Sequence, residues 1–393
     1  MDDLRIAAIG LGQRRSLAVA VHREPGLGAR VTAVCDLDET TVRKEADFFG
    51  VTAAETDYRR LLDRDDVDAV LVATPDHTHA RVAIDALSAG KAVYLEKPMA
   101  TTVEDADAVL RAARQSGARL YVGHNMRHME VVRLMRRLVQ EGQIGTPKAV
   151  WIRHFVGHGG DYFFKDWHAE RSKVNSLLLQ KASHDLDAMH WIVGGATEEV
   201  QAMGGLTVYG GLPRRAAGAP KPENWLSEEH WPPSSQRDLN PVIDVEDLAL
   251  LNLRLDNGVL AAYQQCHYTP DYWRSFTVIG DAGRLENFGD APGGTVRVWN
   301  ASRRDYDPGG DAEFRIPGPI GGHGGADAKV IEEFVRFVRE GGATDTSPVA
   351  ARTAVAAGDL ATRSLRDGGA VLRVPELDGS LRSYFENGQV EAA

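Results

Sequence analysis

The stretch Leu4-Arg5-Ile6-Ala7-Ala8-Ile9-Gly10-Leu11-Gly12-Gln13-Arg14-Arg15 decides the fold of the first part of this 393-residue chain. A short apolar strand runs into a glycine turn, and a helical stretch follows to about Val21. Another strand, Val31 to Cys35, ends at Asp36. A glycine turn followed about 20 residues later by a carboxylate is the pattern that receives the pyrophosphate and the ribose of a dinucleotide. The pattern therefore predicts a cofactor-binding turn.

Each residue of this turn has an expected role at the cofactor. Gly10 permits the tight turn, and Gly12 lets backbone N–H groups approach the pyrophosphate. Arg15 takes the third glycine position, which normally allows close helix–strand packing, so its side chain has to point outward. We count Gln13, Arg14 and Arg15 with the cofactor-binding residues, because the two arginines can donate to phosphate oxygens. The alternative is a plain strand-to-helix turn with a solvated arginine pair.

Asp36 also bears on which dinucleotide binds. Leu37 follows it, so a 2′-phosphate would be repelled by the carboxylate and would find no basic partner next to it. The sequence therefore favours NAD over NADP.

Strands and helices alternate over the first third of the chain, ending with the strand Leu120-Tyr121-Val122-Gly123. This alternation predicts a parallel, doubly wound sheet. Ligands bind outside the carboxyl ends of such strands. Thr74 and Pro75, which follow the strand Val67–Ala73, are expected to lie under the cofactor, and His79 opens the next helix.

The buried strand Ala92–Leu95 ends in Glu96-Lys97-Pro98. Pro98 restricts the backbone of Lys97 to an extended conformation. A lysine fixed at the carboxyl end of a strand can donate to a substrate hydroxyl or exchange a proton with it. The alternative is a surface ion pair between Lys97 and Glu96.

The bulk composition excludes several classes of function. A net charge of -11 argues against nucleic acid as the main partner, because phosphate binding needs a basic face. We expect no membrane span, since every apolar run is shorter than about 18 residues. The start, Met1-Asp2-Asp3, lacks the basic and apolar regions of a signal peptide. Cys35 and Cys266 are expected to be free thiols, with no metal site and a cytoplasmic location.

Together the glycine turn, Thr74-Pro75 with His79, and Glu96-Lys97-Pro98 resemble the Gfo/Idh/MocA oxidoreductases, the glucose-fructose oxidoreductase and inositol dehydrogenase family. The resemblance covers nearly the whole chain, and Glu96-Lys97-Pro98 is its most specific signature. It implies that Lys97 contacts both the nicotinamide region and the substrate, and that the Lys–Pro bond is often cis. Members of the family oxidise or reduce a sugar, a polyol or a related carbon with NAD(P).

The segment Gly123-His124-Asn125-Met126-Arg127 resembles the family's crossover between domains. The resemblance implies that Asn125 and Arg127 lie near the nicotinamide and hold the domain junction. We count Asn125 as cofactor-binding and Arg127 as substrate-binding. The alternative is ordinary hinge polarity. We therefore expect a Rossmann NAD(P)-binding domain over 1–123. An α+β domain for substrate binding and oligomerisation is expected over 124–393.

Aromatic residues alternate with hydrogen-bond donors in the loop 158–171. A sugar ring needs a flat apolar surface together with hydrogen bonds at its edge. Trp167, His168 and Arg171 are the candidate substrate ligands of this loop. The alternative is a lid that packs on its own aromatic side chains.

A second motif, Leu177 to Asp187, leads into a helix expected over Leu186–Val193. It resembles the family motif in which an aspartate lies four residues before a histidine. His184 takes the histidine position and is the candidate for proton transfer. Gln180 takes the aspartate position and cannot act as a base. Lys181 adds a second cation to that of Lys97, so we count it as catalytic and substrate-binding and expect a polar or anionic sugar.

From Glu198 onward, long strands without alternating helices predict a large, mostly antiparallel open sheet. These strands are expected over Val200–Tyr209, Asp247–Leu255, Val259–His267 and Ser275–Gly280. His267 and Tyr268 end one of them and are further candidate substrate ligands. The excursion 210–241 is interpreted as a lid or a dimer arm. One face of the sheet has to be covered, so we expect a homodimer or homotetramer through it, as in the family.

Three functions remain open at this point. The first is an NAD-dependent oxidoreductase that transfers hydride from a CH–OH group of a sugar, sugar acid or polyol, with Lys97 and His184 holding and deprotonating the hydroxyl. The second is an oxidative-eliminative glycoside hydrolase that recycles NAD in place and acts, for example, on a sulfonated or uronic sugar glycoside. The third is a non-catalytic sensor of NAD and a sugar.

Overall fold

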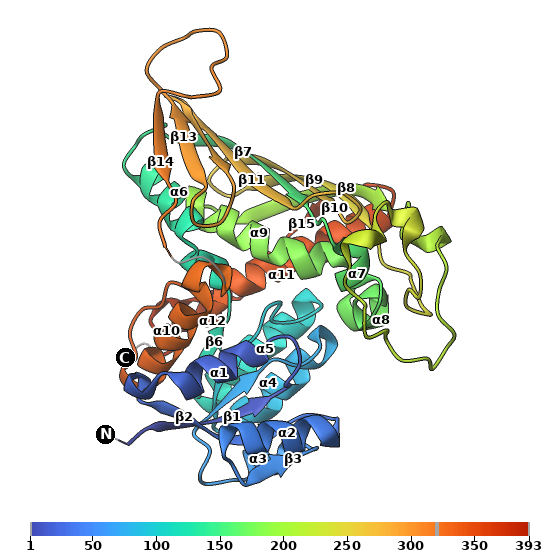
Figure 1. The fold of residues 1–393 in the computed structure, drawn as a ribbon. Helices are drawn as coiled ribbons and strands as arrows, with labels where there is room; N and C mark the ends of the chain where they lie inside the picture. The colour runs from blue at the N-terminus through green and yellow to red at the C-terminus, as the bar shows by residue number, and fades with distance from the viewer. Residues whose placement is uncertain (1, 319–321, 392–393) are drawn as a thin grey trace. The chain divides into compact units, whose positions relative to one another are not determined.

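A computed structural model describes residues 2–318 and 322–391, and Figure 1 shows its fold. The chain forms two compact units. The first consists of the residues up to His128, Gly325–Val355 and the residues from Glu376 onward; the second consists of Met129–Gly324 and Ala356–Pro375. The sequence-based division at residue 123 differs from this, because two later segments return to the first unit.

The first unit is built on a six-stranded sheet in the order β3-β2-β1-β4-β5-β6, and every neighbouring pair is parallel. Its strands are β1 Leu4–Ile9, β2 Ala29–Cys35, β3 Ala53–Glu55, β4 Ala69–Val72, β5 Ala92–Leu95 and β6 Leu120–Val122. The predicted Rossmann fold is confirmed. Because all six strands are parallel, the turns that follow them meet at one edge of the sheet, where ligands of such folds bind.

The helices of the first unit begin at polar caps and bury one side. Asp38 accepts a hydrogen bond from the backbone N–H of Thr41 at the start of α2, and Thr102 accepts one from Asp105 at the start of α5. These helices are α1 Arg15–Arg23, α2 Glu39–Phe49, α3 Arg59–Leu62, α4 His79–Ser88, α5 Val103–Ser116, α10 Ala326–Glu340 and α12 Gly379–Glu386.

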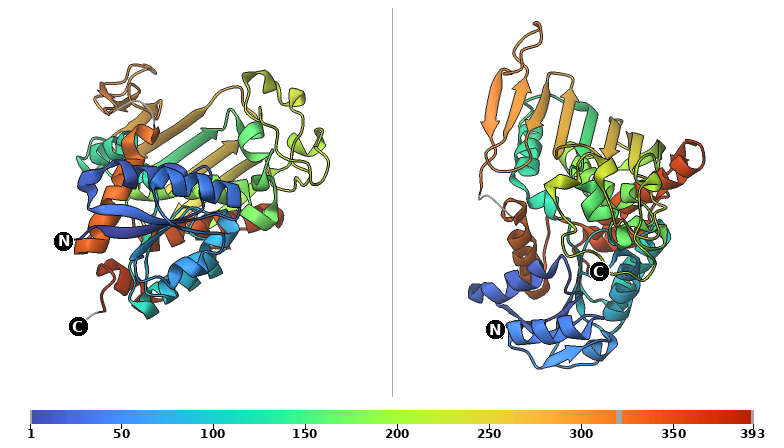
Figure 2. Two further views of the ribbon diagram at one scale, coloured as in Figure 1. Left: turned by 60° about the horizontal axis from the view of Figure 1, so that its bottom comes forward. Right: turned by 45° about the vertical axis from the view of Figure 1, so that its right-hand side comes forward.

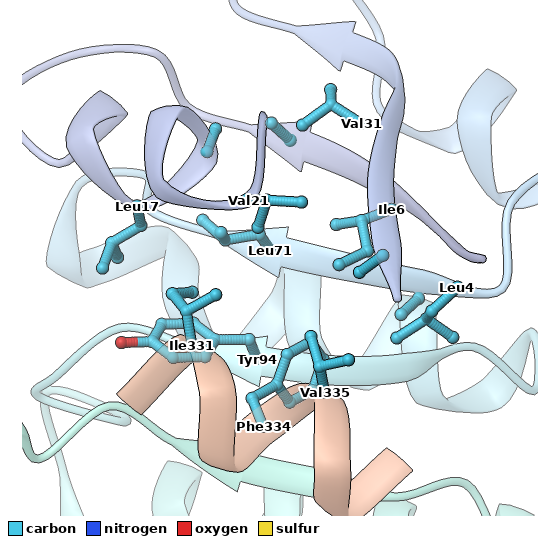
Figure 3. Close-up of a cluster of buried hydrophobic side chains, with 14 of the residues drawn as sticks. Leu4, Ile6, Leu17, Val21, Val31, Leu71, Tyr94, Ile331, Phe334 and Val335 are labelled. Carbon is cyan, nitrogen blue, oxygen red and sulfur yellow. The ribbon is translucent and has the colours of Figure 1, made fainter. Parts of the chain in front are cut away.

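Helix α10 belongs to the first unit because its apolar stripe completes that unit's core. Ile331, Phe334 and Val335 repeat at helical spacing and are buried. Figure 3 shows these side chains facing Tyr94, in a cluster that also holds Leu71. Burying an aromatic or branched side chain stabilises the folded state by about 1.5–3 kcal/mol, which explains why this distant segment returns.

The second unit is built on a nine-stranded sheet in the order β14-β13-β12-β11-β7-β10-β9-β8-β15. Only the β7–β10 pair is parallel, so the predicted, mostly antiparallel sheet is confirmed. The strands are β7 Pro147–Phe155, β8 Thr197–Gly205, β9 Leu248–Leu255, β10 Leu260–Cys266, β11 Trp273–Gly280, β12 Arg284–Phe288, β13 Thr295–Trp299, β14 Ala312–Arg315 and β15 Leu372–Arg373.

Strand β8 ends earlier than the predicted strand Val200–Tyr209. The backbone N–H groups of Thr207, Val208 and Tyr209 all donate to the carboxylate of Asp247, at 2.7–2.9 Å. This carboxylate turns the chain away from the sheet, and alternation of side chains along the strand could not reveal it.

Helix α9 differs from the prediction in its start. It runs over Leu177–Val193, nine residues earlier than the predicted start at Leu186, with Ser176 as its N-cap. The helix is buried nearly all round, so its sequence lacks the polar face that marks an amphipathic helix. The other helices of this unit are α6 Glu130–Gln140, α7 Gly159–Phe163 and α8 Arg171–Val174; α11 Pro348–Arg366 begins in the first unit and ends in the second.

The two faces of the nine-stranded sheet differ. Helices α6 and α9 lie along one face (Figures 1 and 2). On the other face Trp151, Leu250 and Leu260 are between 46% and 55% exposed, and they alternate with buried neighbours as a half-covered sheet requires. The connection between β13 and β14, residues 300–311, projects from the sheet in every view (Figures 1 and 2).

The excursion 210–241 folds back onto its own unit through a buried ion pair beside α7. Asp161 accepts hydrogen bonds from Lys165, 2.8 Å away, from His230 at 2.7 Å and from Gln236 at 3.1 Å. Burial opposes ionisation of Asp161, but Lys165 and Gln236 outweigh it and lower the pKa of that carboxyl. Two residues of the excursion, His230 and Gln236, are thus held by one carboxylate. Within the described parts of the chain, none of the helices has an apolar stretch that could cross a bilayer.

Candidate active site

The glycine turn of the first unit has the shape that a pyrophosphate requires. Gly10 has φ +88°, and a Cβ there would lie 2.6 Å from the carbonyl carbon of Ala73. A Cβ at Gly12 would meet no atom of the described residues within 4 Å. The backbone is therefore closed on the strand side at Gly10 and open at Gly12, as expected for a turn that receives phosphate oxygens.

Asp36 holds this turn in place. Its carboxylate accepts hydrogen bonds from the backbone N–H of Leu11, at 2.8 Å, and of Asp38, at 3.1 Å. Leu37 is 90% exposed beside it. Asp36 thus lies at the carboxyl end of β2 next to the glycine turn, the position from which a carboxylate binds ribose hydroxyls.

Arg14 donates to protein carboxylates. Its Nε lies 2.5 Å from Oε1 of Glu96, and its two terminal nitrogens lie 2.9 and 3.0 Å from the carboxylate of Asp327. Burial opposes the charge of Arg14, but Glu96 and Asp327 outweigh it and raise its pKa above the usual range. The structure thus gives this guanidinium protein partners that the sequence-based roles, phosphate donor or solvated arginine, did not include.

Arg15 points toward α2, as its place in the glycine pattern requires. It pairs with the buried carboxylate of Glu45, and its guanidinium carbon lies 4.2 Å from the ring centroid of Phe48. Gln13, between the glycines and the arginines, is exposed. The guanidinium of Arg15 therefore binds side chains of α2, the helix that follows β2.

His79 links the turns that follow β4 and β5. The ring is buried, with Nδ1 2.7 Å from the carbonyl oxygen of Pro98 and Nε2 2.7 Å from that of Thr74. Pro75 lies between Thr74 and the helix that His79 opens. His79 thus positions the two loops expected to lie at the cofactor.

Lys97 is the one residue between Ala92 and Ala100 that keeps partial exposure. Its backbone N–H donates to Oε2 of Glu96 at 2.5 Å, and the Lys97–Pro98 peptide bond is cis. Glu96 therefore holds Arg14 with one oxygen and the backbone of Lys97 with the other.

The crossover residues of the first unit are buried. Asn125 donates to Oδ1 of Asp327 at 2.8 Å, and Arg127 donates to the carbonyl oxygen of Asp345 at 2.7 Å. Asn125 thus joins the cluster of Arg14, Glu96 and Asp327. Arg127, expected at the substrate, contacts the segment that follows α10.

Three side chains of the first unit have the chemistry of metal ligands. Ligand atoms of His128, Glu333 and Asp345 lie within 4.8 Å of one another. Both oxygens of Glu333 already accept hydrogen bonds, from the hydroxyl of Tyr121 at 2.8 Å and from the backbone N–H of Asp345 at 2.7 Å. This hydrogen bonding accounts for the cluster, and we assign no metal to it.

In the second unit, helix α9 presents Lys181 and His184. These are the two residues between Ser176 and His190 that keep partial exposure, and they lie three residues apart on the helix. The ring centroid of Phe163 lies 4.8 Å from Nζ of Lys181. An ammonium and an imidazole are thus the two partly exposed groups in the otherwise buried stretch of α9 from Leu177 to Met189.

Phe163 gathers several of the predicted substrate ligands. Its ring centroid lies 5.3 Å from that of His168 and 5.2 Å from that of His267, both in edge-on geometry. Trp167 stacks on His168 at 3.7 Å. Phe163 was not among the ligands predicted from the sequence, although the aromatic run Tyr162-Phe163-Phe164 was a signal for it.

The remaining predicted ligands have other partners. Burial lowers the pKa of His267 well below its usual value, and the ring contacts Gln265. Tyr268 accepts a hydrogen bond from the hydroxyl of Thr207 at 3.2 Å. Arg171 pairs with Glu246 at 2.8 Å. His267 is fully buried, so its ring supports the cluster from beneath.

A buried ion network lies under α9. Asp185 accepts from Nδ1 of His154 at 2.7 Å and from the hydroxyl of Tyr263 at 2.9 Å, and Nε of Arg274 lies 3.1 Å away. Burial opposes ionisation of Asp185, but His154 and Arg274 outweigh it and lower its pKa to about 2. This network fixes α9 on strands β7, β10 and β11.

Two family descriptions match the chain. Residues 4–124 match the oxidoreductase family with an NAD-binding Rossmann fold, and residues 132–286 match the GFO/IDH/MocA C-terminal domain. The chain therefore belongs to the GFO/IDH/MocA oxidoreductases and carries an NAD-binding domain. The family predicted from the glycine turn and Glu96-Lys97-Pro98 is confirmed.

Similar proteins include enzymes with different reactions. The 2,7-anhydro-N-acetylneuraminate hydratase of Mediterraneibacter gnavus is 33% identical over 214 residues, 54% of this chain and 55% of that protein. The levoglucosan dehydrogenase of Pseudarthrobacter phenanthrenivorans is 25% identical over 401 residues, 88% of this chain and 92% of that protein. A structure of levoglucosan dehydrogenase in complex with NADH and levoglucosan has the same fold, with TM-score 0.75 and 22% identity over 95% of this chain and 100% of that one.

Proposed function

We propose that the protein is an NAD-dependent dehydrogenase that oxidises a CH–OH group of a sugar, sugar acid or polyol. The observation that carries this proposal is the pair Lys181 and His184, accessible together on the buried helix α9 beside Phe163. A hydrogen-bond donor, a proton acceptor and an aromatic face are the groups that binding and oxidising a polyhydroxylated substrate need. The levoglucosan dehydrogenase relative supports a sugar substrate.

The residues of the first unit fit NAD. Gly10 and Gly12 would receive the pyrophosphate, Asp36 the ribose, and the loops held by His79 would lie beside the rest of the cofactor. Bound NAD supplies the hydride acceptor.

In our proposal, His184 takes the proton of the substrate hydroxyl as its carbon is oxidised, and Lys181 donates a hydrogen bond to the oxygen. Lys97, fixed at the carboxyl end of β5, is the catalytic residue that we propose for the first unit. The alcohol thereby loses a hydride and a proton and becomes a carbonyl group. A positioned acid or base of this kind contributes about 100- to 10,000-fold in rate. An ammonium that stabilises developing negative charge on oxygen adds to this.

The experiment is a panel of sugars, sugar acids and polyols with NAD and NADP, followed by absorbance of the reduced nicotinamide. We expect turnover with NAD. We expect Lys97→Ala and His184→Asn each to lower kcat by about 100- to 10,000-fold without weakening NAD binding. Turnover at the wild-type rate in either variant would remove that residue from the mechanism.

A second candidate function is a three-step reaction on a glycoside. The sugar is oxidised transiently, the aglycone is eliminated, and the sugar is reduced again, so that NAD is recycled in place. The hydratase relative favours it, and so does Lys181, since elimination after oxidation needs a second base. The same panel, extended to glycosides, distinguishes the two reactions. Release of the leaving group without net NADH indicates the second.

We also propose a homodimer or homotetramer formed through the exposed face of the nine-stranded sheet, and a cytoplasmic location. Large apolar side chains such as Trp151 on that face support the oligomer. Cys35 and Cys266 are free, which agrees with a reducing compartment.

A further inference from the structure

A chain of charged hydrogen bonds joins the start of helix α10 to the backbone of Lys97. Both terminal nitrogens of Arg14 donate to the carboxylate of Asp327, at 2.9 and 3.0 Å, and Nε of Arg14 donates to Oε1 of Glu96 at 2.5 Å. The other oxygen of Glu96 accepts the backbone N–H of Lys97 at 2.5 Å. Three segments that lie far apart in the sequence, all in the first unit, thus meet in one chain of contacts.

The geometry of this chain fixes the direction of each group. A guanidinium is planar, and a two-point pair with a carboxylate sets the orientation of both partners. Asp327 therefore sets the plane of Arg14. Arg14 in turn holds one oxygen of the buried Glu96, so that the second oxygen meets the N–H of Lys97. Pro98 has no N–H, so the N–H of Lys97 is the donor through which Glu96 can hold the end of this strand.

Helix α10 has other contacts that dock it in the first unit. Its stripe of Ile331, Phe334 and Val335 is buried in the core of that unit (Figure 3). Burial of apolar side chains is the main favourable contribution to such packing. The two hydrogen bonds that Asp327 accepts from Arg14 therefore have an effect beyond docking the helix, and that effect falls on the glycine turn and on the end of β5.

We propose that Asp327 is a positioning residue for Lys97 and acts through Arg14 and Glu96. This inference rests on the proposed function, in which Lys97 is catalytic. Asp327 takes up no proton and binds no substrate in this assignment; it fixes the backbone from which the ammonium of Lys97 extends. Because Arg14 belongs to the glycine turn, the same chain joins the pyrophosphate-binding turn to the catalytic lysine.

Hydrogen–deuterium exchange at the backbone amide of Lys97 tests the inference in the full-length protein. Mass spectrometry with fragmentation that resolves single amides reads this position and needs no substrate. We expect Asp327→Asn to speed exchange of the amide by about 3- to 10-fold, because an amide side chain accepts only one of the two hydrogen bonds from Arg14. Asp327→Glu, which keeps a carboxylate, should exchange like the wild type.

Glu333→Gln is the matched control. Glu333 is another carboxylate of α10, and it accepts hydrogen bonds from the hydroxyl of Tyr121 at 2.8 Å and from the backbone N–H of Asp345 at 2.7 Å. Its substitution disturbs the contacts of the same helix with other parts of the first unit. Exchange at Lys97 should nevertheless stay at the wild-type rate, because Glu333 is not part of the chain that reaches Glu96.

A second variant covers the case in which Asp327→Asn does not fold. Arg14→Lys keeps the positive charge, but an ammonium lacks the planar fork that holds two carboxylates in fixed directions. Exchange at Lys97 should rise in Arg14→Lys as well.

Kinetics separate positioning from a general loss of stability. With the best substrate of the sugar panel, we expect Asp327→Asn to lower kcat by about 10- to 100-fold, because a small displacement of a catalytic group is costly. The KM for NAD should stay near the wild-type value. Glu333→Gln should keep the wild-type kcat, and Asp327→Glu should recover most of it.

Three outcomes would overturn the inference: unchanged exchange at Lys97 in Asp327→Asn, an equal rise in Glu333→Gln, or a wild-type kcat in Asp327→Asn. The proposed function fails separately, because exchange is measured without turnover. A wild-type protein that forms no NADH, but whose Lys97 amide responds to Asp327→Asn alone, would refute dehydrogenation and leave the link between Asp327 and Lys97 standing.

Discussion

Arg14 joins three segments of the first unit through one guanidinium group. It holds Glu96, which holds the backbone of Lys97, and it holds Asp327 at the start of α10. We expect Arg14→Met to lower the free energy of unfolding by about 3 kcal/mol, because two largely buried carboxylates lose their cation. Urea denaturation measures this loss.

As a control, Asp327→Asn is added to the Arg14→Met variant. The second substitution should recover part of the lost stability, because it removes one unpaired charge. If Arg14→Met unfolds like the wild type but binds NAD about tenfold more weakly, Arg14 acts on the phosphates, as its place in the glycine turn first indicated.

His154 gives the protein a specific dependence on pH. Burial lowers its pKa to about 4, whereas the unfolded chain titrates near 6.5. Between these values the unfolded state binds a proton that the folded state does not, so stability falls as pH drops from about 6.5 toward 4. Asp185, with its pKa lowered to about 2, loses its contribution only below about pH 4.

The pH prediction is tested by urea unfolding at pH 7 and pH 5. We expect His154→Gln, which keeps a donor for Asp185, to reduce the loss of stability between these values by about 2 kcal/mol. An unchanged loss in the variant would show that other groups, such as the buried His267, carry the whole effect.

At the scale of elements, the first sheet followed from the sequence and parts of the second unit did not. Alternating strands, the glycine turn and Asp36 are local signals, so the Rossmann fold could be predicted. The start of α9 could not, because a helix buried on nearly every side shows no 3.6-residue period. The end of β8 could not, because Asp247, some forty residues later, captures its backbone N–H groups.

The start of α9 depends on Ser176. Its hydroxyl accepts from the backbone N–H of Leu179 at 2.9 Å and contacts the hydroxyl of Thr362 at 2.6 Å. We expect Ser176→Ala to lower the free energy of unfolding by about 1–2 kcal/mol, because it removes a cap and a buried partner. Thermal or urea unfolding checks this, with Ser227→Ala, at the partly exposed cap of a short 3-10 helix, as the comparison; equal effects would contradict it.

At the scale of the whole molecule, the candidate site also includes contacts that local sequence patterns could not reveal. Residues that follow strands, such as Asp36 and Lys97, could be selected as candidates from their place in the sequence alone. Asp327 was not, because it comes from a helix more than two hundred residues later that returns to the first unit. Arg14 and Asn125 therefore acquired protein partners that spacing along the chain could not show.

Assembly is tested on the exposed face of the sheet. We expect Trp151→Glu to convert the oligomer into monomers, because a charge in a covered apolar interface is unfavourable. Light scattering after size exclusion measures the mass. Tyr306→Glu, on the projecting connection 300–311, should leave the assembly unchanged; monomers in the wild type would contradict the proposal.

Helix α10 has a consequence for how the protein is made on the ribosome. The core around Tyr94 includes Phe334 and Ile331, so a nascent chain that has already exposed the glycine turn still lacks one wall of its nucleotide domain. We therefore expect that domain to close only after translation has passed the second unit. A stalled chain ending at residue 324 should therefore stay sensitive to protease in its first 128 residues, whereas one that has released residue 345 should be protected.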